Sequence, residues 1–195
     1  MKLYLFRHGE TDWNKQGLIQ GQTDIALNSE GIRQAQELAE YFFSQGIKVN
    51  KVYTSPHKRA KDTAVIVAQR LGVESIEKDG FREMGFGLWE GMTWPQVRAD
   101  YVQDYQKWYE NRRYQAPPQG ESYQELLVRV VKALREVIAD NKEDVAVIAH
   151  SAVIMTLQSW LHDTAFDEMV KRYKTKNADG IIIDSKIILS KATKE

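Results

Sequence analysis

The sequence predicts an α/β protein: a three-layer sandwich with a mostly parallel central sheet, helices on both faces of that sheet and a small helical cap insertion. Short apolar runs at 3–6, 51–54 and 145–149 alternate with longer segments whose apolar residues recur at helical spacing. The run at 145–149 is apolar throughout, which is typical of a parallel strand covered on both faces. Each of the three runs is followed by charged residues or histidine.

The amino-terminal half begins with the strand at 3–6. Residues 11–28 are polar and interrupted by glycine, so they predict a long loop. Ser29 is the expected N-cap of a helix that ends at Gly46. The next expected elements are a strand at 51–54, a helix at 57–71, a strand at 73–76 and a charged, glycine-containing loop at 80–91.

The carboxyl-terminal half begins with one helical segment at 94–114, dense in aromatic residues and broken by Pro117-Pro118. Ser122 and Glu125 fit a capping box for the next helix. The strand at 145–149 and a helix to Leu161 follow, and the runs 181–184 and 187–190 predict a hairpin. The expected organisation is a single domain over 1–195, with the cap insertion at about 92–119.

The composition limits the classes of function. Lys plus Arg and Asp plus Glu balance at 27 each, so no overall field favours nucleic acid or an anionic membrane, and an anion site must be local. The absence of cysteine excludes disulfides and thiolate chemistry. The apolar run before Arg7 is too short for a signal peptide or a membrane span, so a cytoplasmic protein is expected.

Arginine and histidine follow the ends of the predicted strands. Arg7 and His8 follow the first, Arg59 lies shortly after the second, and His150 follows the strand at 145–149. If these strands are neighbours, the side chains converge at the carboxyl edge of the sheet, where α/β proteins bind ligands. Two guanidinium forks can hold a phosphoryl group, and a neutral imidazole between them can attack phosphorus.

The chain resembles the histidine phosphatase superfamily, which includes cofactor-dependent phosphoglycerate mutase. The resemblance spans nearly the whole chain in the expected order. Its motifs are Arg7-His8-Gly9-Glu10-Thr11 with Trp13-Asn14, Gly21 and Asp24 ahead of Leu27 and Gly31, Ser55-Pro56 with Arg59-Ala60 and Thr63-Ala64, Glu83 with Gly87 and Glu90-Gly91, Gly120-Glu121-Ser122 with Arg129, His150, and Asn177-Ala178.

The resemblance implies a role for each matching residue. His8 would take the phosphoryl group, and Glu83 would protonate the leaving oxygen and later activate water. His150 would be the third catalytic residue, surrounding the phosphate together with Arg7 and Arg59. The further expected substrate-binding residues are Asn14, Gln20, Gly21 and Ser151. No metal and no cofactor are expected, because the arginines supply the positive charge.

The resemblance favours a phosphatase over two alternatives. Gln22 stands where mutases typically carry tryptophan, and the insertion between Gly91 and Gly120 is shorter than theirs. Against this, Arg112-Arg113 before Pro117-Pro118 is similar to the paired arginines of mutases, so a phosphoglycerate mutase is the first alternative. A non-catalytic phospho-ligand binding protein is the second, although such a protein would be expected to lack His8 or Glu83.

Several assignments stay open at this stage. Ser151, where relatives often have glycine, either caps a helix or contacts phosphate. Glu121 is either a site carboxylate or a helix-start acid, and Arg112 and Arg113 either contact substrate or form a solvated helix end. The aromatic residues of 94–114 either pack in the core or line the site, whereas His57 is expected to face solvent. The expected partner is a small phosphorylated metabolite, such as alpha-ribazole phosphate, a sugar phosphate or a phosphoglycerate, and a homodimer stays open.

Overall fold

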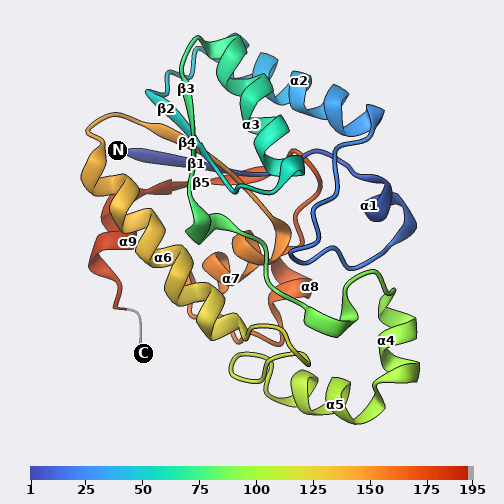
Figure 1. Cartoon of the computed structure of the whole chain (residues 1–195). Helices are drawn as coiled ribbons and strands as arrows, with labels where there is room; N and C mark the ends of the chain where they lie inside the picture. The colour runs from blue at the N-terminus through green and yellow to red at the C-terminus, as the bar shows by residue number, and fades with distance from the viewer. Residues whose placement is uncertain (193–195) are drawn as a thin grey trace.

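A five-stranded sheet forms the centre of the protein, which is described here by a computed structural model covering residues 1–192. The strand order is β3-β2-β4-β1-β5, where β1 is Lys2–Arg7, β2 is Lys51–Thr54, β3 is Glu74–Glu77, β4 is Val145–Ala149 and β5 is Gly180–Asp184. All neighbours pair in parallel except β5, which is antiparallel to β1 (Figure 1). The predicted mostly parallel α/β sheet is therefore confirmed.

Helices cover both faces of this sheet. The longer helices are α2 (Ser29–Ser44), α3 (Lys58–Leu71), α6 (Tyr123–Asp140) and α7 (Ser151–Leu161). The shorter helices are α1 (Asp12–Gln16), α4 (Trp94–Asp100), α5 (Val102–Glu110), α8 (Met169–Tyr173) and α9 (Ser185–Ser190), with single 3₁₀ turns at Asp79–Phe81 and Gly87–Trp89. In Figure 1, α2 and α3 lie on one side of the strands, and α6, α7 and α9 lie on the other.

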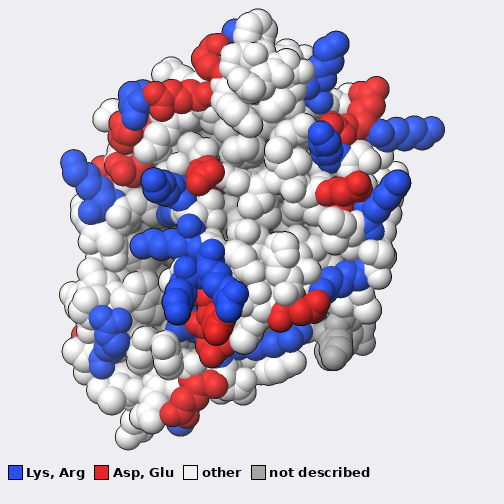
Figure 2. Space-filling model, turned by 180° about the vertical axis from the view of Figure 1, so that it is seen from behind, with Lys and Arg blue, Asp and Glu red and all other residues white. Residues whose placement is uncertain are grey.

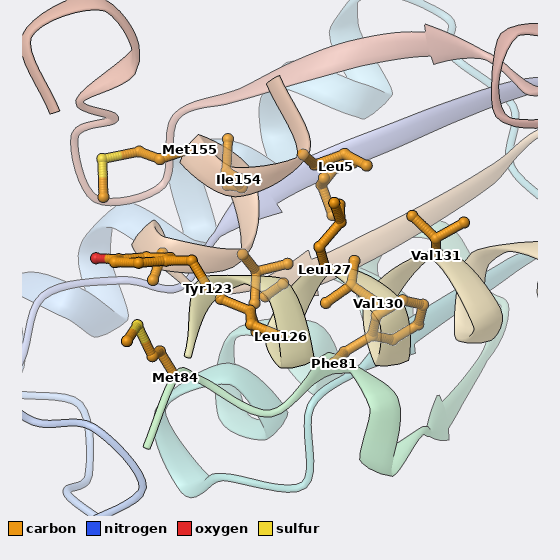
Figure 3. Packing of buried hydrophobic residues seen from close by; sticks show 14 of the residues in the cluster. Leu5, Phe81, Met84, Tyr123, Leu126, Leu127, Val130, Val131, Ile154 and Met155 are labelled. Atoms are coloured by element: carbon orange, nitrogen blue, oxygen red, sulfur yellow. The ribbon is translucent and has the colours of Figure 1, made fainter. Parts of the chain in front are cut away.

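Alternation along the strands divides the core into two clusters. Tyr4 and Phe6 of β1 pack with residues of α2 and α3, whereas Leu3 and Leu5 pack with residues of α6 and α7. Period-two alternation is what a strand between two helical layers requires. Figure 3 shows the second cluster, where Leu126, Leu127, Val130 and Val131 of α6 lie against the sheet.

The second cluster continues into the segment that carries α4 and α5. Trp89, Val97 and Trp108 are buried there and belong to the same apolar cluster as the α6 residues. The predicted single helical segment at 94–114 is two helices, because the chain departs from helical geometry at Tyr101 (φ −122°, ψ 44°). In Figure 1 this segment projects from the sheet on the side of the carboxyl ends of the parallel strands.

Three local expectations from the sequence are wrong. The run 187–190 lies in α9 and not in a hairpin strand, because Asp184 caps the helix and accepts a hydrogen bond from the Lys186 amide. The loop at 11–28 contains α1, which Thr11 and Asn14 start with a capping box. Asn28, not Ser29, is the N-cap of α2.

Charge is distributed without one dominant sign. Figure 2 shows basic and acidic side chains interspersed on the face seen from behind, with one group of basic side chains near its centre. Within residues 1–192, none of the helices has the length and apolar character needed to cross a membrane.

Candidate active site

Parallel pairing brings the sequence-predicted side chains to one edge of the sheet. Arg7 pairs with Ala149 at the ends of β1 and β4, so His8 and His150 occupy the next position of each strand. The His8 amide donates a hydrogen bond to the Ala149 carbonyl at 3.0 Å, and the two imidazole centroids lie 5.2 Å apart. Strand β2 pairs with the other side of β4 and leads through His57 into α3, which carries Arg59.

A cavity of about 590 Å³ opens at this edge. Its inner wall includes all but one of the residues predicted to bind or transform a phosphoryl group: Arg7, His8, Asn14, Gln20, Gly21, Arg59, Glu83 and Ser151. His150 is not among the lining residues and lies behind this wall, against the His8 ring. The outer wall comes from α4, α5 and the region of α8.

The His8 imidazole is held as one neutral tautomer. Its Nδ1 lies 2.6 Å from the carbonyl oxygen of Gly9, and because a carbonyl can only accept, Nδ1 carries the proton and Nε2 keeps a lone pair. Burial lowers the pKa of His8 well below 6.5, and the positive charges of Arg59 and Arg7 lower it further. His8 is therefore neutral and nucleophilic at neutral pH.

The backbone of His8 is fixed from two further sides. Its carbonyl accepts hydrogen bonds from the Ala178 amide at 3.2 Å and from Asn177 Nδ2 at 3.1 Å. The next amide, that of Gly9, donates to Thr63 Oγ1 of α3 at 3.1 Å. The position of the imidazole thus follows from the sheet, from α3 and from the segment before β5.

Arg7 and Arg59 combine fixed orientation with unused donors. Arg59 is fully buried, and its two terminal nitrogens donate to the carbonyls of Thr23 and Gly21. One terminal nitrogen of Arg7 donates to the Thr175 carbonyl at 2.8 Å. The Nε atoms of both arginines are buried without a hydrogen-bond partner among residues 1–192. Burial lowers the pKa of Arg59 to about 10, so its guanidinium stays charged at neutral pH.

His150 and His57 extend the group of imidazoles. The His150 ring is fully buried, and neither of its nitrogens has a hydrogen-bond partner within the described part of the chain. The ring of His57 lies 5.3 Å from that of His150, centroid to centroid, and His57 is 5% exposed. The expectation that His57 faces solvent is wrong, because the short turn after β2 brings His57 to the same edge of the sheet, where its ring packs against that of His150.

Glu83 is a buried carboxyl group at the side of the cavity. Burial raises its pKa, while hydrogen bonds from the Met84 and Ala152 amides and the charges of Arg59 and Arg7 act in the opposite direction. A carboxyl group with a raised pKa retains a proton more readily, which suits a proton donor. Ala152 lies at the start of α7, directly after His150 and Ser151.

The other predicted substrate contacts surround the same cavity. Asn14 Oδ1 accepts from the Thr11 amide and from Asn177 Nδ2, so the amide Nδ2 of Asn14 is the group that can donate to a ligand. Gln20 is buried, and its Oε1 has no partner in residues 1–192. Gly21 adopts φ 51°, and a Cβ atom there would lie 2.1 Å from Oε1 of Glu90. Ser151 is the first residue of α7 and lines the cavity, whereas the N-cap is His150.

The structure separates the paired arginines of the cap. Arg112 is buried, lines the cavity and lies over the Trp108 and Tyr109 rings at 4.5 Å and 4.9 Å. Arg113 does not line the cavity, and its Nε donates to Gln124 Oε1 at 2.8 Å. The sequence had not identified the other cationic residues of the outer wall, Arg98, Lys171 and Lys174.

The aromatic residues of the cap serve both packing and lining. Trp108 is buried, stacks on Trp94 with centroids 5.4 Å apart, and both rings line the cavity. Tyr105 and Tyr109 line it as well. The two interpretations left open for this segment therefore both hold.

The arrangement matches a known family. The family model described as histidine phosphatase superfamily (branch 1) matches residues 3–186. This chain belongs to the histidine phosphatase superfamily. The family membership that the sequence motifs indicated is confirmed, and the fold agrees with it.

Phosphatases are among the similar proteins. The uncharacterized phosphatase PhoE of Bacillus subtilis is 40% identical over 156 residues, covering 78% of this chain and 73% of that protein. The structure of a mycobacterial glucosyl-3-phosphoglycerate phosphatase in complex with VO3 superposes with a TM-score of 0.80 at 29% identity, covering 91% of this chain and 89% of that one.

A longer relative also matches. The 6-phosphofructo-2-kinase/fructose-2,6-bisphosphatase of Gallus gallus is 34% identical over 167 residues, which is 86% of this chain. The chain spans only 34% of the length of that relative.

The buried position of His57 predicts a pH-dependent stability. Burial, followed by the charges of Arg59 and Arg82, lowers the pKa of His57 from 6.5 to about 4, although Asp24 and Glu90 oppose the shift. The unfolded chain thus binds this proton more tightly, so the free energy of unfolding should fall as pH decreases from about 6.5 to about 4, by up to ~1.4 kcal/mol per pH unit.

Urea unfolding of the wild type and of His57→Gln, measured at several pH values, tests this expectation. Between about pH 6.5 and pH 4, the free energy of unfolding of the variant should depend less steeply on pH, by up to ~1.4 kcal/mol per pH unit, which corresponds to one proton. Equal slopes, or a His57 proton resonance that titrates near pH 6.5 in the folded protein, would contradict it.

Proposed function

We propose that this protein hydrolyses phosphomonoesters of small metabolites through a phosphohistidine intermediate on His8. One observation carries the proposal: a neutral imidazole, with its Nδ1 proton donated to the Gly9 carbonyl, lies in a cavity wall with Arg7 and Arg59, whose buried Nε atoms have no partner among residues 1–192. Buried donors without partners are uncommon in proteins and call for an explanation. A tetrahedral anion between these donors supplies one.

In the first step the His8 Nε2 lone pair attacks phosphorus. A P–N bond forms, the bond from phosphorus to the ester oxygen breaks, and Glu83 gives its proton to that oxygen, so the leaving group departs as an alcohol. Arg7 and Arg59 stabilise the charge on the phosphoryl oxygens, while the His150 ring supports the His8 ring from behind. The proton on Nδ1 stays there throughout, hydrogen-bonded to the Gly9 carbonyl.

In the second step water attacks the phosphoryl group. The carboxylate of Glu83 takes a proton from that water, the P–N bond breaks, and the electron pair returns to Nε2. Inorganic phosphate leaves, and Glu83 is again protonated. Both steps use the same donors, so no metal ion and no cofactor are required for charge neutralisation.

Hydrolysis is favoured over the two alternatives. A phosphoglycerate mutase must retain a phosphorylated substrate against the phosphohistidine, and here Arg113, one of the paired arginines, points away from the cavity to Gln124. A non-catalytic binding protein has no need of a buried carboxyl with a raised pKa, as Glu83 has. The phosphatases among the similar proteins support this choice.

The outer wall indicates the class of substrate. Aromatic rings of Trp94, Tyr105 and Trp108 line the cavity and suit a ring or an apolar group on the substrate. Arg112, with its Nε unpaired and buried, suits a second anionic group such as a carboxylate or a second phosphate. A small metabolite that carries both features is the proposed substrate.

A covalent adduct should form on His8. Rapid quenching of the enzyme with a labelled phosphomonoester should give an adduct that is stable in base and labile in acid, because protonation of the imidazole weakens the P–N bond. The adduct should be absent in His8→Ala. An acid-stable adduct on serine, or a fully active enzyme without any adduct, would rule out this mechanism.

Turnover should not depend on added metal. The guanidinium groups of Arg7 and Arg59 stay protonated across the working pH range and supply the positive charge at the phosphoryl group. The rate in excess EDTA should therefore equal the rate in buffer alone. A loss of activity that magnesium or zinc restores would show that the metal-independent proposal is wrong.

Arg112 should control the affinity for doubly anionic substrates. Loss of a charge-assisted hydrogen bond is worth about 1.5–3 kcal/mol, so Arg112→Ala should raise KM for phosphoglycerates or sugar bisphosphates by roughly 10- to 100-fold. The KM for p-nitrophenyl phosphate should change little. Arg113→Ala is the matched control, because that side chain lies outside the cavity. Equal effects of the two variants on all substrates would contradict this role.

A further inference from the structure

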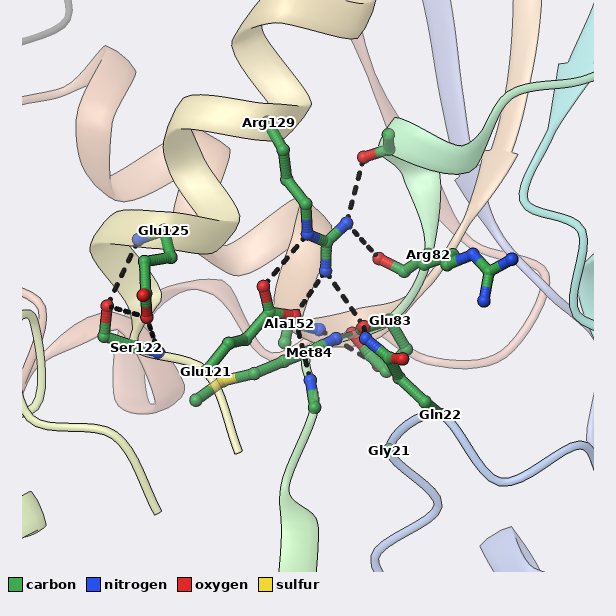
Figure 4. A network of polar contacts seen from close by, with 12 residues as sticks. Gly21, Gln22, Arg82, Glu83, Met84, Glu121, Ser122, Glu125, Arg129 and Ala152 are labelled. Carbon is green, nitrogen blue, oxygen red and sulfur yellow. Dashed lines mark hydrogen bonds and ion pairs between the residues drawn. The ribbon is translucent and has the colours of Figure 1, made fainter. Parts of the chain in front are cut away.

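Arg129 of α6 binds the backbone of residues 80–85, which we call the Glu83 segment. Its guanidinium donates to three backbone carbonyls: those of Gly80 at 3.0 Å, Arg82 at 2.8 Å and Glu83 itself at 3.0 Å. Gly80 lies within the 3₁₀ turn Asp79–Phe81, and Arg82 and Glu83 follow it, where no strand or helix fixes the backbone. Figure 4 shows the guanidinium at the centre of this set of contacts.

Glu121 binds both Arg129 and the carboxyl-terminal end of the Glu83 segment. One of its oxygens accepts from the Gly85 amide at 2.9 Å, and its other oxygen accepts from Nε of Arg129 at 3.0 Å. Glu121 directly precedes Ser122, the N-cap of α6, and Arg129 lies two turns further along that helix. One helix therefore contacts the Glu83 segment on both sides of Glu83.

Of the two interpretations left open for Glu121, that of a site carboxylate does not describe its contacts, whereas its position directly before the N-cap of α6 agrees with a helix-start acid. Glu121 does not line the catalytic cavity, so it is not a carboxylate that contacts substrate. It is bound to Arg129 in a half-buried ion pair, with side chains 18% and 25% exposed. Because the two opposite charges offset each other, the pair can fix the backbone at Glu83 without adding a net charge next to its carboxyl group.

The amides that donate to the Glu83 carboxyl connect the Arg129–Glu121 ion pair to proton transfer. The Glu83 carboxyl is oriented by the amides of Met84 and Ala152, and Met84 belongs to the segment that Arg129 and Glu121 hold. A shift of this segment would move the carboxyl away from the leaving oxygen while leaving Arg7, Arg59 and His8 in place, since these are fixed by other contacts.

We propose that Arg129 and Glu121 are positioning residues that act through Glu83 and set its alignment for proton transfer. The inference rests on the proposed role of Glu83 as the proton donor. Arg129 and Glu121 do not contact the phosphoryl group, so their loss should affect the step that Glu83 assists and not the binding of the phosphoryl anion.

The test compares Arg129→Lys and Glu121→Gln with the wild type in single-turnover experiments. Lysine keeps the charge but cannot reach three carbonyls from fixed positions, and glutamine keeps an acceptor for the Gly85 amide without the ion pair. A misplacement of about 1 Å can cost roughly 100-fold in rate, so we expect a 10- to 100-fold loss with a poor leaving group such as an alkyl phosphate. The loss should be much smaller for p-nitrophenyl phosphate, and the inhibition constant of vanadate should stay within about twofold.

Glu136→Gln is the matched control. Glu136 lies on the same helix and pairs with Lys78 at 3.2 Å, without contacting the Glu83 segment. This variant loses one ion pair of α6 and should keep wild-type rates with both substrates. A loss that depends on the leaving group in Glu136→Gln would show that the effect is a general one of α6 and would overturn the inference.

The Glu83→Gln background separates the two proposals. If Arg129 acts through Glu83, adding Arg129→Lys to Glu83→Gln should lower the rate no further. A full additional loss, or equal losses for both substrates in Arg129→Lys alone, would overturn the positioning role while leaving the acid role of Glu83 intact. If Glu83→Gln itself affects good and poor leaving groups equally, the acid role fails, and the inference fails with it.

Discussion

The parallel pairing of β4 with β1 and β2 is the constraint on which the rest of the site depends. The pairing of β1 with β4 joins residues 142 apart in the chain, such as Leu3 and Val145, and that of β2 with β4 joins residues 94 apart, such as Val52 and Ala146. The first pairing sets Arg7 opposite Ala149, so the residue that follows each strand is a histidine. A slip of one residue would turn His8 or His150 toward the other face of the sheet. Such a slip would also exchange the apolar side chains of β1 between the two core clusters, and this fixes the register.

The same edge of the sheet carries a cost in stability. Two arginines, three histidines and a carboxyl group are buried or nearly buried there, and several of their nitrogens lack partners among the described residues. Each unsatisfied buried group costs about 1–3 kcal/mol. The two apolar clusters around the sheet offset that cost. A bound anion that accepts hydrogen bonds from these donors would remove this cost, so part of the free energy lost in folding would be regained as affinity for the anion.

The sequence predicted elements whose signal is local or periodic. The strands of the parallel sheet, the helix begun by Ser122 and the cavity-lining positions of Arg7, His8 and Arg59 follow from apolar runs, a capping box and residues at strand ends. It did not predict the helix cap at Asp184 or the features set by distant contacts. His57 is buried because β4 lies beside β2. Arg112 lies over the rings of Trp108 and Tyr109, whereas Arg113 contacts Gln124 and Phe166.

The site is assembled from three parts that depend on different regions of the chain. The arginines and imidazoles are fixed by the sheet and α3, the Glu83 segment is held by α6, and the outer wall comes from α4, α5 and the region of α8. The hydrogen bonds of the His8 ring and of the Glu83 carboxyl are formed with Gly9, Met84 and Ala152, which lie outside α4, α5 and α8. Side chains of the outer wall can therefore change without loss of these contacts. This separation gives a physical reason why proteins of one fold can share phosphoryl chemistry and still differ in substrate.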